Sequence, residues 1–272
     1  MRQIRQLPLT FSGIFLGFVV LFLLVIFIST RFISPKKLRE KPSPFFRFLL
    51  NQFCRIAFFL GGVHVHITGM EKLPRDSRYL LVSNHLFAFD PLIYYYAIVH
   101  DELCFISKKE NFSITVVAEF MRALLCLPID RENDREALRT ILKAIEFLKQ
   151  DKTSIAVFPE GYTSKTGKLQ EFRNGVFKIA QKAGVPIVVC VLSNTPAIIK
   201  NMFRRHTDVY LDVLDVIPAE DLAGETSKSF DRSLSVSVFG VVSPVSQRDT
   251  ACRVTKTCSA SCSSDSPFCM RS

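Results

Sequence analysis

The chain has 272 residues, of which 48% are hydrophobic, and it contains 25 Phe and no Trp. This hydrophobic fraction is high for a soluble enzyme and too low for a polytopic transporter. The net charge of +10 is concentrated in residues 1–60, which hold nine Lys or Arg and one acid. Such clustering beside a hydrophobic segment favours anionic lipid headgroups over nucleic acid as the partner.

The most hydrophobic segment runs from Leu7 to Thr30 and contains no charged residue. As a helix it would rise about 36 Å, which exceeds the hydrocarbon core of about 30 Å. A cleaved signal peptide is the alternative, but the run is too long and no small-residue cleavage site follows. We therefore predict a transmembrane anchor in residues 1–31 of a cell-membrane protein. More Lys and Arg follow the segment than precede it, which predicts that the catalytic domain lies on the cytoplasmic face.

Residues 32–61 are predicted to form a basic linker and then an amphipathic helix over Phe45–Leu60. Arg47, Asn51 and Arg55 recur every four residues and form one polar stripe among Phe, Leu and Ile. This pattern predicts a helix in the bilayer interface that turns its basic stripe toward lipid phosphates. A helix packed on the core of the next domain is the alternative, and both descriptions can hold together.

Residues 62–224 are predicted to form one catalytic domain of the α/β class. Short β-rich runs alternate with helical periodicity, which indicates a largely parallel sheet flanked by helices. The predicted strands are Val63–Thr68, Tyr79–Ser83, Leu103–Ser107, Leu127–Ile129, Ile155–Phe158, Ile187–Leu192 and Val209–Val216. The predicted helices are Pro91–His100, Asp134–Gln150, which Asp134 can cap, and Gly175–Ala183.

Residues 225–272 lack this alternation, and Ser accounts for 13 of residues 226–272. The segment is typical either of a disordered low-complexity tail or of a shifted reading frame. Its four Cys form no Cys-x-x-Cys pair, which argues against a zinc site. His64 and His66 alternate on a predicted strand, where exposure or pairing is more common than metal ligation. We therefore expect neither a metal nor a cofactor.

The first candidate site follows the strand that ends at Ser83 and reads Asn84-His85-Leu86-Phe87-Ala88-Phe89-Asp90-Pro91. The carboxyl end of a strand is the usual position for a site in an open α/β sheet. Imidazole titrates near neutral pH, so His85 is suited to removing a proton from an alcohol. Asp90 follows across a turn that Pro91 converts into a helix, and its carboxylate can return to the imidazole. A helix-capping Asp beside a core His is the alternative.

The second candidate site is Phe158-Pro159-Glu160-Gly161, again at the end of a predicted strand. Pro and Gly bracket an acid, which presents Glu160 to a crevice. Further hydrogen-bond donors follow closely, namely Thr163, Ser164, Lys165 and Lys168. Alone, this pattern is also ordinary turn chemistry. The two segments in this order are more specific than either one.

Together the segments resemble the glycerolipid acyltransferase family, in which a His-x4-Asp motif precedes a Phe-Pro-Glu-Gly block. Pro128-Ile129-Asp130-Arg131 resembles the family's block that ends in an arginine for the acceptor phosphate. Val185-Pro186-Ile187-Val188 resembles its last apolar block. The resemblance covers about residues 45–220, includes the order of all four blocks, and is closest to bacterial lysophosphatidic acid (1-acylglycerol-3-phosphate) acyltransferases.

The resemblance implies direct acyl transfer from acyl-CoA or acyl carrier protein to the free hydroxyl of lysophosphatidic acid, which yields phosphatidic acid. It implies His85 as the general base and Asp90 as the group that stabilises the imidazolium, without an acyl-enzyme. The acceptor-binding residues that it implies are Glu160, Gly161, Arg131, Thr163 and Ser164, with possible phosphate contacts from Lys108, Lys165 and Lys168. The partners are then a thioester donor, a lysophospholipid and anionic membrane lipids.

Two departures from the family pattern concern acceptor binding. The glycines usual before the arginine block are replaced by Val117-Ala118-Glu119-Phe120 and Leu124-Leu125-Cys126. Tyr162-Thr163-Ser164 stands where the family commonly has Thr-Arg-Ser, which removes one phosphate-binding arginine that Lys165 or Lys168 can replace.

Other functions remain open on the sequence. Within the acyltransferases, glycerol 3-phosphate or another lysolipid is an alternative acceptor. An inactive membrane-anchored binding protein with the same fold is an alternative from a different class. A serine hydrolase is excluded because the chain has no Gly-x-Ser-x-Gly elbow.

Overall fold

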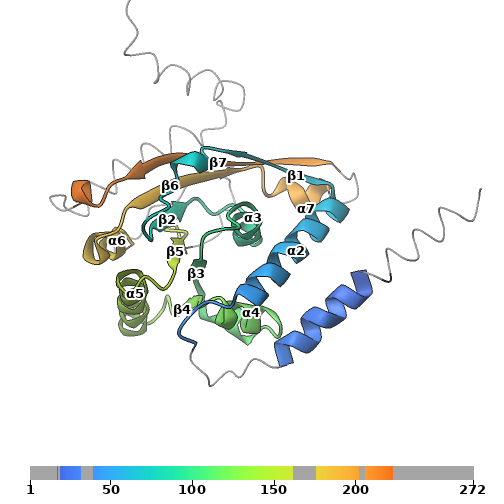
Figure 1. The fold of residues 1–272 in the computed structure, drawn as a ribbon, viewed down its shortest axis with the longest axis horizontal. Helices are drawn as coiled ribbons and strands as arrows, with labels where there is room; N and C mark the ends of the chain where they lie inside the picture. Colours follow the sequence, from blue (N-terminus) through green and yellow to red (C-terminus); the bar gives the residue numbers. More distant parts are fainter. Residues whose placement is uncertain (1–16, 18, 32–38, 162–175, 202–205, 223–272) are drawn as a thin grey trace, which may run out of the picture.

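The computed structural model describes residues 17, 19–31, 39–161, 176–201 and 206–222. The protein is built on a sheet of seven strands in the order β1-β7-β6-β2-β5-β3-β4 (Figure 1). All neighbouring strands are parallel except β6 and β7, so the predicted α/β class with a largely parallel sheet is confirmed. The strands are β1 Val63–Thr68, β2 Leu80–Ser83, β3 Leu103–Lys108, β4 Leu127–Ile129, β5 Ser154–Val157, β6 Ile187–Ser193 and β7 Thr207–Ile217.

Helices flank the sheet on both sides. They are α2 Pro44–Gly61, α3 Asp90–Ala97, α4 Val117–Ala123, α5 Asp134–Lys149, α6 Phe177–Ala183 and α7 Ala197–Asn201, with short 3-10 turns at Met70–Lys72, Lys109–Ser113 and Glu220–Leu222. Helices α5 and α6 lie on one side of the central strands, and α2, α3 and α4 lie on the other (Figure 1). Strands β2 and β5 are therefore buried along their whole length, which is why they read as continuous apolar runs in the sequence.

The start of α5 differs from the prediction. The capping residue is Asn133 and not Asp134, because the Asn133 side-chain oxygen accepts hydrogen bonds from the backbone N–H groups of Arg135 and Glu136 at 3.1 and 3.2 Å. Asp134 is the first helical residue, where its negative charge suits the positive end of the helix dipole. Helices α4 and α7 are absent from the prediction; they have seven and five residues, which is at most two turns.

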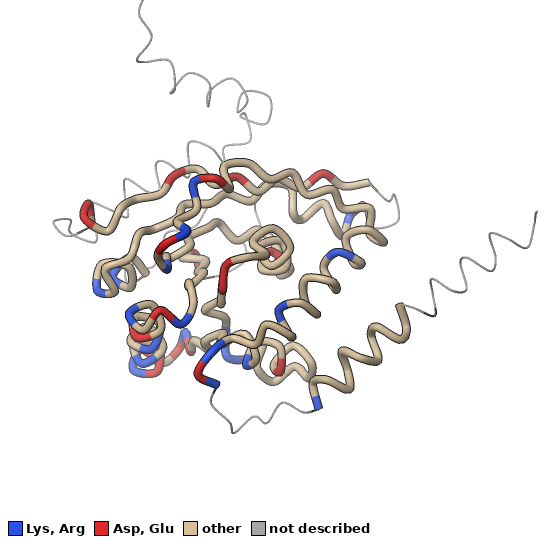
Figure 2. The backbone as a smooth tube through the Cα atoms, in the orientation of Figure 1, with Lys and Arg blue, Asp and Glu red and all other residues tan. Residues whose placement is uncertain are grey.

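Residues 19–31 form a helix, whereas the rest of the predicted transmembrane segment lies outside the described residues. Figure 2 shows that this helix carries no charge before its C-terminal end. Ile26 packs in a cluster with Phe46 and Phe120, while Leu21 remains 58% exposed and Phe27 50%. In the described part of the chain, no helix is both long and apolar enough to cross a membrane. The predicted tail, residues 225–272, also lies outside the described residues.

Helix α2 turns most of its polar stripe toward the domain and not toward lipid phosphates. Arg47 donates a hydrogen bond to the carbonyl of Ile98, and Asn51 donates one to the carbonyl of Tyr95. The predicted orientation is therefore wrong for these two residues, because carbonyls in the last turn of α3 and just after it lack intrahelical donors and take them from α2. Of the stripe, Arg55 is exposed. The outer face of α2 is instead apolar and exposed, through Phe45, Phe48, Phe59 and Leu60.

Candidate active site

Four segments that carry predicted site residues lie at the carboxyl edge of the sheet. Strands β2, β5, β3 and β4 are consecutive neighbours and run parallel, so their carboxyl ends lie on the same edge. His85 follows β2, Glu160 follows β5, Lys108 ends β3 and Arg131 follows β4. The sheet therefore gathers residues that are far apart in the sequence on the edge where open α/β sheets place their sites.

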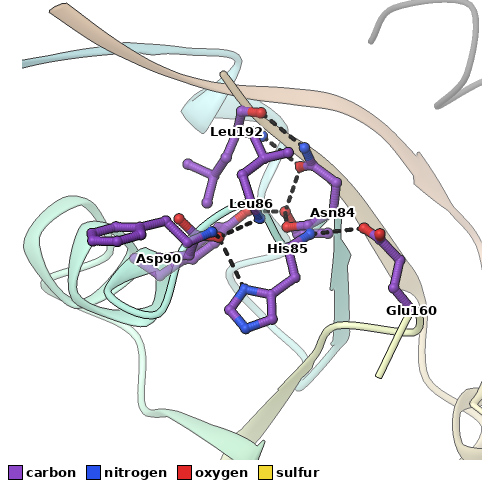
Figure 3. A network of polar contacts seen from close by, with 9 residues as sticks. Asn84, His85, Leu86, Asp90, Glu160 and Leu192 are labelled. Carbon is purple, nitrogen blue, oxygen red and sulfur yellow. Dashed lines mark hydrogen bonds and ion pairs between the residues drawn. The ribbon is translucent and has the colours of Figure 1, made fainter. Parts of the chain in front are cut away.

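His85 and Asp90 form a close pair at this edge (Figure 3). The His85 Nδ1 atom lies 2.9 Å from Asp90 Oδ2, and the two side chains are 16% and 0% exposed. Asp90 is the first residue of α3, and the same oxygen accepts the backbone N–H groups of Leu86 at 2.7 Å and Phe87 at 2.8 Å. The turn between β2 and α3 thus closes on the carboxylate and holds it against the imidazole.

This geometry suits proton transfer from a hydroxyl. A carboxylate at Nδ1 favours the tautomer in which Nδ1 carries the proton, which leaves Nε2 as a hydrogen-bond acceptor. The imidazole points away from the backbone of the turn (Figure 3). When Nε2 takes a proton, the adjacent carboxylate stabilises the resulting imidazolium. The pair can therefore serve as a general base for an alcohol.

Glu160 ties the second segment to the first. Its Oε1 accepts the backbone N–H of His85 at 2.9 Å, and the residue is only 3% exposed (Figure 3). Gly161 has φ 74°, a left-handed conformation that glycine adopts without a steric cost, and its N–H donates to the Phe158 carbonyl at 3.1 Å. The Phe-Pro-Glu-Gly segment thus forms a tight turn that directs the carboxylate at the turn carrying His85.

Two further residues, which the sequence motifs contain without an assigned role, support the segment that carries His85. The Phe158 ring stacks on the His85 ring with centroids 4.2 Å apart and planes inclined by 12°. The Asn84 side chain, fully buried, bonds to both the N–H and the carbonyl of Leu192 at 2.8 and 2.9 Å. Asn84 thereby extends the pairing of β2 with β6 by one residue. The available signal was an amide side chain placed directly after a strand.

A buried tyrosine links the strand before this turn to the helix after it. Tyr94 of α3 donates its hydroxyl to Ser83, the last residue of β2, at 2.5 Å. Burial raises the pKa of Tyr94 well above its ordinary value, so the phenol stays neutral and remains a donor. Strand β2 and helix α3 are therefore joined both by the turn and by this side-chain hydrogen bond.

The basic residues expected to bind phosphate lie toward the β3 and β4 end of the edge. Lys108 is exposed, and its neighbour Lys109 pairs with Asp130 next to Arg131. The hydrogen bond and charge of Lys109 hold the pKa of Asp130 below its ordinary value. The remaining predicted contacts, Thr163, Ser164, Lys165 and Lys168, lie outside the described residues.

Two residues before the arginine block have a positive φ. Leu125, in one of the stretches that replace the family's glycines, has φ 61°, and Val116, just before the other stretch, has φ 71°, although side chains disfavour both conformations. A left-handed conformation costs a residue other than glycine about 1–2 kcal/mol. The segment before Arg131 thus keeps a glycine-like backbone turn without the glycine, and burial of Leu125, 7% exposed, offsets part of the cost.

Histidines on the opposite part of the sheet lie far from this edge in the strand order. His64 and His66 lie on the exposed side of β1, and Asp208 of β7 bonds His66 at 2.8 Å and His206 at 3.2 Å. Among the described residues, no group of three or more His, Cys, Asp or Glu has a geometry that could hold a metal ion.

The fold and the site define a class of protein: an α/β enzyme whose buried carboxylate and imidazole can deprotonate a hydroxyl at the edge of a parallel sheet. Residues 64–193 match the family model described as Acyltransferase. Over 200 residues, the chain is 31% identical to the probable 1-acyl-sn-glycerol-3-phosphate acyltransferase of Mycoplasma pneumoniae, which covers 69% of this chain and 74% of that protein.

Two further relatives agree with this match. The 1-acyl-sn-glycerol-3-phosphate acyltransferase of Borreliella burgdorferi is 29% identical over 191 residues, or 68% of this chain and 76% of that protein. The crystal structure of the 1-acyl-sn-glycerophosphate (LPA) acyltransferase PlsC from Thermotoga maritima is similar with a TM-score of 0.65 and 25% identity, covering 91% of this chain and 99% of that one. The chain belongs to the acyltransferase family, which confirms the predicted resemblance.

Proposed function

We propose that the protein transfers an acyl group from acyl-CoA or acyl carrier protein to the free hydroxyl of lysophosphatidic acid, which makes phosphatidic acid. The observation that carries this proposal is the His85–Asp90 pair, held at 2.9 Å by the turn after β2. The names of the Mycoplasma, Borreliella and Thermotoga relatives support lysophosphatidic acid as the acceptor. No residue of the site is required to form a covalent acyl intermediate.

In the proposed reaction, His85 Nε2 takes the proton of the acceptor hydroxyl while the oxygen attacks the thioester carbonyl carbon. A tetrahedral intermediate forms and then collapses, which breaks the carbon–sulfur bond. The thiolate leaves and is protonated by the imidazolium, so the base is regenerated in each cycle. Asp90 stays bonded to Nδ1 and stabilises the charged imidazole.

The acceptor phosphate is proposed to lie toward the β4 end of the edge. Adjacent strands are about 4.8 Å apart, so the backbone after β4 lies about 14 Å from the backbone after β2. A long Arg131 side chain shortens this gap, and its guanidinium can hold a phosphate through two hydrogen bonds. Gly161, Thr163 and Ser164 are proposed to contact the acceptor, and Lys108, Lys165 and Lys168 the phosphate. Glu160 was expected to hold the acceptor glycerol, and its bond to the His85 backbone supports a positioning role as well.

Membrane attachment is proposed to involve the segment Leu7–Thr30 and the outer face of α2. The exposed apolar side chains of residues 19–31 support this proposal, because they continue directly into the basic segment that starts at Arg31. On α2, Phe48 is 59% exposed and Phe59 76%. Apolar area of this kind inserts into the boundary between headgroups and acyl chains. We propose that the domain lies on the cytoplasmic face of the cell membrane, near anionic lipids.

The test is an assay of the full-length protein in mixed lipid–detergent micelles. Labelled acyl-CoA and labelled acyl carrier protein are supplied as separate donors. The acceptors are lysophosphatidic acid, glycerol 3-phosphate and a neutral-headgroup lysolipid. We expect labelled phosphatidic acid from lysophosphatidic acid, with at least a tenfold preference in kcat/KM over the other acceptors.

Each alternative predicts a different result. Faster acylation of glycerol 3-phosphate or of another lysolipid would replace the proposed acceptor. Binding of lysophosphatidic acid without turnover by either donor would favour an inactive binding protein. His85→Ala protein, prepared in parallel, gives the background rate that wild-type turnover must exceed.

A further inference from the structure

Helix α2 is attached to the far end of the helix that carries Asp90. Arg47 Nη2 donates to the Ile98 carbonyl at 2.7 Å, and its Nε donates to the Val99 carbonyl at 3.4 Å. One turn later, Asn51 Nδ2 donates to the Tyr95 carbonyl at 3.1 Å. These carbonyls stand at the C-terminal end of α3, beyond its last intrahelical donors. Two side chains of α2 therefore cap α3.

Burying the Arg47 guanidinium in this contact costs free energy. Burial lowers the pKa of its guanidinium from the ordinary value, and among the described residues its Nη1 atom is buried without a partner. Removing a guanidinium from water is costly unless other groups replace its hydration. The negative end of the α3 dipole and two carbonyls supply part of that compensation. Arg55, in the same stripe, is exposed and keeps its hydration.

Helix α3 is short enough to transmit a displacement from one end to the other. It has eight residues, so its ends are separated by about 12 Å of hydrogen-bonded backbone. Asp90 is its first residue, and one carboxylate oxygen of Asp90 accepts from His85, Leu86 and Phe87. A tilt at the capped end would change these three distances together.

The opposite face of α2 is the apolar surface through which membrane attachment is proposed. Phe45, Phe48 and Phe59 are 52%, 59% and 76% exposed on that face. On the inner side, Phe58 makes an edge-on contact with Tyr96 of α3, with ring centroids 5.3 Å apart. Helix α2 therefore lies between that surface and α3, the helix that carries Asp90.

We propose that Arg47 and Asn51 are positioning residues for acyl transfer, which hold the C-terminal end of α3 so that Asp90 at its N-terminal end stays bonded to His85. This inference rests on the proposed function of the His85–Asp90 pair. Both residues act through Asp90, and neither one contacts the substrates.

The chain offers a matched control, because Arg55 shares the helix, the charge and the four-residue spacing but is exposed. We expect Arg47→Gln to lower kcat about tenfold with KM for the acceptor within twofold, and Arg55→Gln to change both constants by less than twofold. Arg47→Lys keeps the charge and the N–H donors of one nitrogen, and it is expected to recover most of the lost kcat. Equal, salt-dependent losses in Arg47→Gln and Arg55→Gln would instead indicate phosphate contacts and would overturn the proposal.

A double-mutant cycle separates positioning from general loosening of the fold. In an Asp90→Asn background, Arg47→Gln is expected to lower the residual kcat by less than twofold, because the group through which it acts is already disabled. A full tenfold loss in that background would contradict the proposal.

Hydrogen exchange gives a readout that does not depend on turnover. The backbone amides of Leu86 and Phe87 donate to Asp90, so Arg47→Gln is expected to accelerate their exchange at least tenfold relative to Arg55→Gln. Unchanged exchange at these amides would overturn the inference even if the protein acylates lysophosphatidic acid. Accelerated exchange in a protein without turnover would refute the proposed function and leave the mechanical link intact.

Discussion

Two histidine–carboxylate pairs of almost equal length stand on different parts of the same sheet. His85 and Asp90 are 2.9 Å apart and 16% and 0% exposed, whereas His66 and Asp208 are 2.8 Å apart and 52% and 35% exposed. The first pair follows β2 at the carboxyl edge. The second joins His66 of β1 to Asp208 of the neighbouring strand β7 on the solvent-exposed side of the sheet. Distance alone therefore does not distinguish a candidate catalytic pair from a surface ion pair.

The difference lies in what surrounds each pair. Asp90 receives two backbone N–H groups besides the imidazole, and His85 is held through its own N–H by Glu160 and over its ring by Phe158. A site fixed in this way needs no reorganisation when charge develops. Asp208 is shared between two exposed imidazoles, which water and salt screen. Burial and hydrogen bonds to the backbone, more than the histidine–carboxylate distance, therefore distinguish the candidate site from the surface pair.

The largest expected effect in this comparison is at His85. His85→Ala should lower kcat by about 10²–10⁴, the usual contribution of a general base, with little change in the melting temperature. Steady-state acylation by purified protein measures it. His66→Ala is the control and should retain activity within twofold. Equal activity of wild type and His85→Ala would remove the first pair from the mechanism.

The carboxylate of the buried pair should matter next. Asp90→Asn is expected to lower kcat about 10²-fold, because the amide cannot stabilise an imidazolium and can favour the wrong imidazole tautomer. The measurement is kcat at saturating donor and acceptor, with circular dichroism to verify folding. A folded Asp90→Asn protein with wild-type kcat would show that the buried pair resembles the exposed one in being dispensable.

A smaller effect is expected at Glu160, where two roles can be separated. If the carboxylate positions His85, Glu160→Ala lowers kcat about tenfold, whereas Glu160→Gln retains an acceptor for the His85 N–H and stays within about threefold. If the negative charge binds the acceptor, both variants raise KM by similar factors. The kcat and KM values of the two variants therefore decide between positioning and acceptor binding.

The smallest effect is expected at the exposed pair. Asp208→Asn should keep kcat within twofold at pH 7.5, because no bond of Asp208 reaches the carboxyl edge. The hydrogen bond from His66 lowers the pKa of Asp208. Its small contribution to stability is therefore present above the unfolded-state pKa of about 3.9 and is lost as the pH falls through the lowered folded-state pKa. The melting-temperature difference between wild type and variant should shrink between pH 5 and pH 3, and a difference that grows on acidification would contradict this.

Much of the fold was legible in the sequence because strands buried on both faces leave a simple pattern. β1 and β4 match their predicted bounds, β2, β3 and β6 differ by one residue at one end, and β5 is shifted by one residue. Helix α5 was equally clear, although its cap is Asn133, because Asn and Asp are adjacent and both are good capping residues. Local sequence patterns predict such elements, but they do not decide which of two adjacent capping residues starts the helix.

The sequence predicts the candidate site only in part. His85, Asp90 and Glu160 could be named because they stand at strand ends, but nothing local indicated that Glu160 would bond the backbone of His85. That contact exists because β2 and β5 are neighbours in the sheet, although His85 and Glu160 are 75 residues apart in the chain. The same reasoning applies to Asn84 and Leu192, which meet because β2 also pairs with β6.

By itself, the sequence determined the α/β class, the strand ends that carry polar residues and the resemblance to an acyltransferase, because periodicity and motif order are properties of neighbouring residues. The tertiary structure alone decided which polar groups meet. It placed Arg47 and Asn51 on carbonyls at and just beyond the C-terminal end of α3 and not toward lipid, and it separated a largely buried histidine pair from an exposed one. The physical reason is that contacts across strands and helices depend on sheet order and helix packing, which no local pattern records.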